Sequence, residues 1–258
     1  MFHDDPIGLS PPALPPGPEA DAAVERPFRL RDLAAGVALA ATGFLAVLGF
    51  TVLLIVRGGY ERTDPTVALL LTVTTLLTEA WVGAIVLGIL WVRGLPLRAL
   101  RLGIPTSWSW MPVALFGAYG AVIAYAGAVA LAERVTGADL SGFRAGNQIP
   151  DDLPRTAAIW ITLGVAVVIV APLAEELFFR GLLYRGLSDR FGPGVGMVVS
   201  GVAFALVHFN VSVVVPFALI GIVFAWVYRA SGSLWTTIVA HAIFNGVSFA
   251  ATVYGVGQ

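Results

Sequence analysis

Five ionisable side chains interrupt the long apolar stretches of this sequence. They are the carboxylates Glu79, Glu175 and Glu176 and the imidazoles His208 and His241. An ionisable group at the centre of a membrane helix costs about 2.5–3.5 kcal/mol to insert, so it is retained where it has a partner or a function. Carboxylates and imidazoles are also the groups that most often transfer protons in enzymes. These residues are therefore the first candidates for a functional site.

Their spacing places several of them on defined faces of helices. Glu176 and Arg180 stand four residues apart, so they can pair on one helical face. The side chain of Glu175 is rotated by about 100° around the helix axis from that of Glu176, so it can face a different helix. His241 and Asn245 are also four residues apart and present two polar side chains from one face.

The positions along the chain are compatible with one shared depth in a membrane. Phe204 precedes His208 by one turn, where its ring can shield the imidazole from lipid. Glu175 lies 17 residues before the turn at Gly192, and His208 lies 16 residues after it. His241 lies nine residues beyond the next turn. We therefore expect a site about 13 Å above the inner interface at 1.5 Å per residue.

Three motifs follow one another in the second half of the chain. They are Glu175-Glu176-x-x-x-Arg180, Phe204-x-x-x-His208 and His241-x-x-x-Asn245. In this order they resemble the motifs of the CPBP family, which contains CAAX-processing endopeptidases and bacteriocin-processing and abortive-infection proteins. The segment 231–235 also resembles the lead-in to the third motif, and the resemblance covers about residues 155–250.

The resemblance implies an intramembrane endopeptidase that cuts a peptide bond near the cytoplasmic face of the membrane. Glu175 would act as the general base that activates water, assisted by His208. His241 and Asn245 would stabilise the oxyanion of the tetrahedral intermediate, where one such donor is typically worth a factor of about 10²–10³. The supporting motif residues would be Glu176, Arg180 and Phe204. The expected substrate is a membrane-associated or hydrophobic peptide.

The metal requirement is open at this stage. Two histidines and a glutamate could hold zinc, in which case Glu175, His208 and His241 would be the ligands. We favour catalysis that requires no cofactor, because Asn245, one turn from His241, is a poor zinc ligand and a good oxyanion donor.

Composition predicts the elements that must position these residues. The chain of 258 residues is 58% hydrophobic and 12% charged, with a mean hydropathy of +0.86, whereas soluble domains carry about a quarter charged residues. Long uncharged stretches alternate with short arginine-bearing segments, which predicts an all-α, polytopic membrane bundle of about seven transmembrane helices. The expected spans are 33–56, 66–92, 111–132, a fourth that starts at 156 and extends toward 187, two between 190 and 229, and 234–253. The 38 residues between Arg190 and Arg229 barely fit two crossings, so we expect at least one short helix and a break near Asn210, Ser212 and Pro216.

We expect the chain to divide into three parts of different structure. Residues 1–30 are rich in proline and predict a disordered tail. Residues 31–154 form N-terminal transmembrane helices, and residues 155–254 form the CPBP-like catalytic core. Ten arginines in the expected inner segments against five in the outer ones predict a cytoplasmic N-terminus in the plasma membrane.

The sequence also excludes some classes and leaves two rivals. A net charge of −1 gives no reason to expect nucleic-acid binding, and the absence of cysteine excludes disulfides and thiolate chemistry. One rival is a non-catalytic membrane protein that serves in immunity or as a scaffold against peptide toxins. The other is a transporter in which Glu79 and Glu175 relay protons, although no inverted repeat is visible. Glu79 lies outside the motifs and is interpreted as an acid satisfied by a neighbouring helix or protonated in place.

Overall fold

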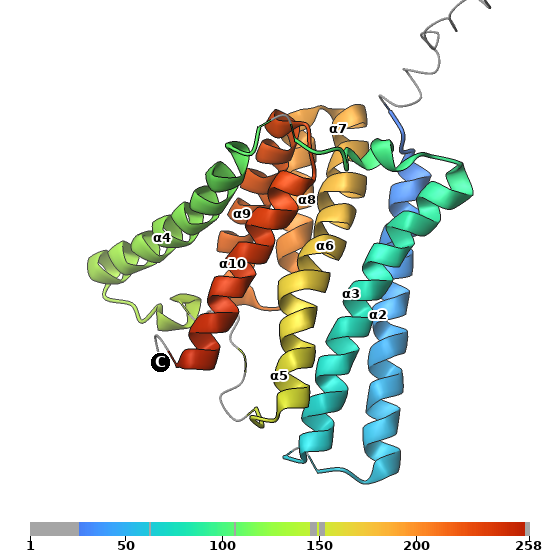
Figure 1. Cartoon of the computed structure of the whole chain (residues 1–258). Helices are drawn as coiled ribbons and strands as arrows, with labels where there is room; N and C mark the ends of the chain where they lie inside the picture. Colours follow the sequence, from blue (N-terminus) through green and yellow to red (C-terminus); the bar gives the residue numbers. More distant parts are fainter. Residues whose placement is uncertain (1–25, 62, 106, 145–148, 150–152, 256–258) are drawn as a thin grey trace, which may run out of the picture.

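The protein is a bundle of long helices in a computed structural model that describes residues 26–61, 63–105, 107–144, 149 and 153–255 (Figure 1). The predicted tail lies mostly outside these residues, and its last part packs against the bundle through the buried Phe28. No β-strand occurs among the described residues. The helices are α2 (Leu30–Gly58), α3 (Pro65–Arg93), η1 (Leu97–Leu100), α4 (Trp110–Thr136), η2 (Ser141–Arg144), α5 (Ala157–Gly164), η3 (Val165–Val170), α6 (Ala171–Glu175), η4 (Glu176–Tyr184), α7 (Arg185–Phe191), α8 (Pro193–Leu206), α9 (Val211–Ser231) and α10 (Trp235–Tyr254).

Helices α2 and α3 form an antiparallel hairpin with clear stop and start signals. Gly59 ends α2 with φ of 66°, a left-handed conformation that glycine adopts without strain. Asp64 begins α3 by accepting a hydrogen bond from the Thr66 backbone N–H at 2.7 Å, and Pro65 takes the first helical position. The same hydrogen bond lowers the pKa of the Asp64 carboxyl, so this end of α3 carries a negative charge at neutral pH.

The fourth span is one continuous 35-residue helix, Ala157–Phe191, built from α5, η3, α6, η4 and α7. Its segments η3 and η4 are π-helical, and Glu175 lies at the end of the short α-helical stretch between them. π-helical turns are rare and often occur at functional sites. The helix thus passes through Pro172 without ending, and it changes its hydrogen-bonding pattern on both sides of the motif glutamates.

The predicted short helix is α8, which is connected to α9 by a tight turn. At 14 residues, α8 is about 21 Å long, less than the ~30 Å of a hydrocarbon core. The break falls where it was expected at Asn210, whose side chain accepts a hydrogen bond from the Ser212 backbone N–H at 3.0 Å and caps α9. Phe209 beside it has φ of 50°, a left-handed conformation that costs a bulky residue energy. Placing the break at Ser212 and Pro216 was wrong, since both lie inside α9.

The bundle contains six helices that are long and apolar enough to span a membrane within the described ranges, together with the shorter α8. This arrangement confirms the predicted polytopic helical bundle. The main core fills the half of the bundle near the start of α2, where α7 ends and α10 begins (Figure 1). Its members include Leu33, Leu90, Leu100, Phe178, Leu182, Tyr228 and Leu234. The search for a functional site therefore concerns the other half of the bundle.

Candidate active site

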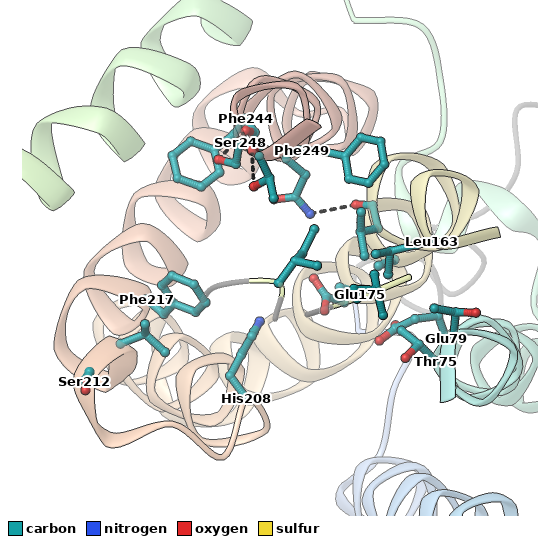
Figure 2. Close-up of a pocket in the computed structure, with 18 of the residues that line it drawn as sticks. Thr75, Glu79, Leu163, Glu175, His208, Ser212, Phe217, Phe244, Ser248 and Phe249 are labelled. Atoms are coloured by element: carbon teal, nitrogen blue, oxygen red, sulfur yellow. Dashed lines mark hydrogen bonds between the residues drawn. The ribbon is translucent and has the colours of Figure 1, made fainter. Parts of the chain in front are cut away.

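The four residues predicted to act in catalysis line one pocket. Glu175, His208, His241 and Asn245 all contribute to the wall of a cavity of about 940 Å³. They come from three segments, namely the end of α6, the turn after α8 and the middle of α10. Figure 2 shows the side chains of Glu175 and His208 pointing into this cavity. Helices far apart in sequence thus bring the three motifs together, and the catalytic roles of these residues stay a prediction.

His241 lies between the two neighbouring glutamates. Its Nδ1 is 3.1 Å from Oε1 of Glu176, and its Nε2 is 3.5 Å from Oε2 of Glu175. His241 and Glu176 are both buried, and the fully enclosed carboxylate of Glu176 contacts the imidazole on the side away from the pocket. The ring nitrogen on the pocket side faces Glu175, which also lines the cavity. The sequence did not reveal this contact of Glu176 with His241, because the two residues are 65 positions apart.

Arg180 supports this arrangement from inside the core. Its Nη1 lies 2.8 Å from Oε1 of Glu176, which confirms the predicted pair at four-residue spacing. The guanidinium carbon also lies 4.6 Å from the ring centre of Phe204 and 5.2 Å from that of Phe224. Both partners of the ion pair are at most 1% exposed. The buried charge of Arg180 depends on Glu176 in the same segment, and the contacts of the guanidinium with the two rings connect η4 to α8 and α9.

His208 is oriented by the end of its own helix. Its Nδ1 lies 2.8 Å from the carbonyl oxygen of Phe204, so the ring donates there and leaves Nε2 with a free lone pair. The imidazole also packs edge-on against the rings of Phe204 and Phe217, at 5.1 and 4.6 Å between centres. The expected contact between Phe204 and His208 is therefore present. A neutral imidazole held in this way can accept a proton at Nε2.

Asn245 connects α10 to the first π-helical segment. Its side-chain Nδ2 donates to the carbonyl oxygen of Val167 at 2.9 Å. Val167 belongs to η3, where the i to i+5 pattern changes how backbone carbonyls are satisfied. The amide group has a second N–H, which leaves one donor for a ligand in the pocket.

The described residues do not assemble a metal site. No group of three histidine, cysteine, aspartate or glutamate side chains lies close enough to hold a metal ion in the described part of the chain. Both ring nitrogens of His241 face carboxylates, whereas Nε2 of His208 is free among the residues that the structure describes. The zinc set considered from the sequence, Glu175, His208 and His241, would need rearrangement to converge on one ion.

Glu79 is the residue that sequence reasoning placed outside the site. It lies on α3 in the wall of the same pocket as Glu175. Figure 2 shows Glu79 and Thr75 on the side of the pocket next to Glu175, with Phe217 across from them. The signal in the sequence was the position of Glu79, since it is the one acidic residue within an otherwise uncharged span.

The pocket runs from the motif residues to the end of the bundle that carries the turn between α2 and α3. Three helices line it with the half nearer that end: α3 with its cap, from Asp64 to Glu79, the α5–α6 helix from Leu163, and α10 as far as Thr252. In the opposite direction the cavity meets the packed core around Phe178. The start of α2 lies at that closed end (Figure 1).

Together these features define a multi-pass membrane protein with a polar pocket built halfway through its helical bundle. Residues 157–247 match the family described as type II CAAX prenyl endopeptidase Rce1-like. The chain is 29% identical over 77 residues to "Putative membrane peptidase YdiL" of Bacillus subtilis strain 168, which covers 30% of this chain and 32% of that protein. It is 30% identical over 78 residues to "UPF0177 protein YxdF" of Lactococcus lactis subsp. lactis strain IL1403, which covers 30% of this chain and 42% of that protein. No solved structure gives a significant match.

These matches confirm the resemblance to the CPBP family, and residues 157–247 carry the region that this chain shares with it. The region contains all seven residues of the three motifs. The chain spans less than half the length of each of the two curated relatives.

Proposed function

We propose that this protein is an intramembrane endopeptidase that hydrolyses a peptide bond with water activated by Glu175 and His208. The observation that carries the proposal is the convergence of Glu175, His208, His241 and Asn245 on one cavity inside the bundle. A packed membrane protein has no structural need for four polar side chains around an open space, because each costs energy to hold there.

The geometry supports a division of roles among these residues. Glu175 takes a proton from the attacking water, and Nε2 of His208 shares in this transfer from the turn after α8. Asn245 donates a hydrogen bond to the oxygen that becomes negative in the tetrahedral intermediate, and so does Nε2 of His241 when both of its ring nitrogens carry a hydrogen. Glu176 does not react; its carboxylate holds the ring of His241 and pairs with Arg180. The proton taken by the base then passes to the leaving amine.

The mechanism that we propose requires no cofactor. Asn245 supports it, since this amide lines the same pocket as His241 and is a poor zinc ligand but a good oxyanion donor. Zinc bound by Glu175, His208 and His241 is the alternative. It would supply an activated water directly.

The substrate that we propose is a membrane-associated or hydrophobic peptide in the lipid bilayer. Aromatic side chains from α9 and α10 line the cavity beside the polar residues, among them Phe217, Phe244 and Phe249. Apolar walls with a few convergent polar groups are typical of sites that bind and orient a ligand. The length of the cavity extends toward one end of the bundle, so an extended segment fits it.

The side of entry follows from the arginines. Nine of the fifteen lie in segments at the end of the bundle where α2 starts, and by the positive-inside tendency this count supports a cytoplasmic location of that end. The pocket opens at the other end. The sequence led us to expect both a cytoplasmic N-terminus in the plasma membrane and cleavage near the cytoplasmic face, and a pocket that opens at the far end of the bundle does not fit the two together. We retain the first and propose that substrates enter from the non-cytoplasmic side.

Proteolysis by the purified full-length protein tests the function. A panel of apolar peptides is incubated with wild type, Glu175→Gln and Ser248→Ala, the last as a control because Ser248 lines the pocket but bonds to its own helix. We expect Glu175→Gln to lose about 10²–10⁴-fold in kcat at unchanged thermal stability, the range of general base catalysis, and Ser248→Ala to keep its activity. Equal rates in wild type and Glu175→Gln would refute the mechanism. Binding without cleavage would favour the rival, a non-catalytic immunity or scaffold protein.

A further inference from the structure

Glu79 occupies a position where an unpaired acid is costly. It is the fifteenth residue of the 29-residue helix α3, and therefore lies near the middle of a membrane span. It has no hydrogen-bond or ion-pair partner among the described residues. The nearby hydroxyl of Thr75 donates to the carbonyl oxygen of Leu71 at 3.2 Å. An unpaired carboxylate at this depth is expected to serve a ligand or a reaction.

The surroundings of Glu79 carry an excess of negative charge. The described lining of the pocket contains three carboxylates, Asp64, Glu79 and Glu175, and no arginine. Arg180 is buried in the core, and its charge is already matched by Glu176 at 2.8 Å. Glu79 and Glu175 lie on the same side of the pocket, so negative charges on both would repel each other. A positively charged ligand would relieve this repulsion, whereas a carboxylate of a substrate would increase it.

We propose that Glu79 is a specificity-determining residue whose carboxylate binds a basic side chain of the substrate peptide next to the bond that is cleaved. This inference rests on the proposed function, because it assigns a substrate class to the same pocket. Glu79 lies on the wall that Glu175 also forms, so a bound cation there would place the adjacent peptide bond beside the proposed base. The apolar remainder of the peptide would pack on Phe217 and Phe244 across the cavity. The mouth carries Asp64, which attracts the same charge on entry.

Peptide binding tests this inference without requiring cleavage. Two fluorescent apolar peptides, identical except for lysine or norleucine at one central position, are titrated by anisotropy against full-length protein in nanodiscs of zwitterionic lipid. The variants are wild type, Glu79→Gln and Glu61→Gln, where Glu61 is an exposed glutamate outside the pocket. A charge-assisted hydrogen bond is worth about 1.5–3 kcal/mol, which corresponds to about 10- to 100-fold in affinity.

We expect wild type and Glu61→Gln to bind the lysine peptide at least 10-fold more tightly than the norleucine peptide, and Glu79→Gln to lose this preference. Removal of the unpaired charge should leave the melting temperature equal or higher. Equal affinity for the two peptides in wild type, or a preference that survives Glu79→Gln, would overturn the inference. Cleavage assays with the same peptides separate the two proposals. A lysine preference in binding without hydrolysis would refute the proposed function alone. Loss of norleucine-peptide cleavage in Glu79→Gln would instead show that Glu79 takes part in the reaction and overturn its role in specificity.

Discussion

Replacing Glu176 by glutamine should reveal how strongly the core depends on a single charge. The substitution keeps the shape of the side chain and an oxygen that can accept from Nδ1 of His241, but it removes the negative charge beside Arg180. The guanidinium is 1% exposed and is left between the rings of Phe204 and Phe224 without a counter-charge. Breaking a buried pair in this way typically costs about 3–5 kcal/mol, or roughly 200- to 5,000-fold in the unfolding equilibrium.

The free energy of unfolding is measured in mixed detergent micelles for Glu176→Gln, Arg180→Met, the double variant and the exposed control Glu61→Gln. Because the double variant buries no unpaired charge, we expect it to be more stable than Glu176→Gln, with a coupling energy of about 2 kcal/mol or more between the two sites. Additive effects would refute the ion pair as the source of the cost. A stable but inactive Glu176→Gln beside an active Glu175→Gln would show that the roles of the two glutamates are reversed.

Two further predictions address the metal and the side of entry. Prolonged chelation should leave proteolysis unchanged, and elemental analysis should find no stoichiometric metal. About one zinc per chain, with activity that is lost on chelation and restored by zinc, would overturn the cofactor-free mechanism. The assignment of the four site residues would still stand. Because the chain has no cysteine, Thr63→Cys at the mouth of the pocket should react with a membrane-impermeant maleimide in intact cells, and Ala230→Cys at the opposite end only after permeabilisation. The reverse pattern would place the mouth in the cytoplasm.

The spans were predictable because lipid imposes one simple requirement on a polypeptide. Backbone polar groups that cannot hydrogen-bond to water must form their hydrogen bonds within the helix. An uncharged stretch such as 111–132 therefore predicts a helix, here α4. The break before α9 was equally local, since Asn210 caps that helix. The four-residue spacing of Glu176 and Arg180 predicted their ion pair for the same reason.

The parts of the site that escaped prediction depend on contacts between helices distant in sequence. Nothing near Glu79 indicated that α3 would face Glu175, and nothing near Glu176 indicated a contact with His241 on α10. The π-helical segments on either side of the glutamates were also unforeseen, because their apolar residues fit a regular helical period as well. The direction in which the pocket opens could not be predicted from the sequence, because it depends on which half of each helix packs into the core.

The packed half of the bundle has a consequence for the cell as well as for the site. The layer around Phe178, Leu182 and Leu234 closes the bundle toward the start of α2, while the pocket opens at the other end. If water fills the open pocket, this packed layer is the part of the protein across which the membrane potential would fall, and it separates the proposed hydrolytic groups from the solution on the far side. Moving one charge through a potential of 100 mV is worth about 2.3 kcal/mol. We therefore expect shorter side chains in this layer to let ions leak through the protein before they affect the proposed hydrolysis.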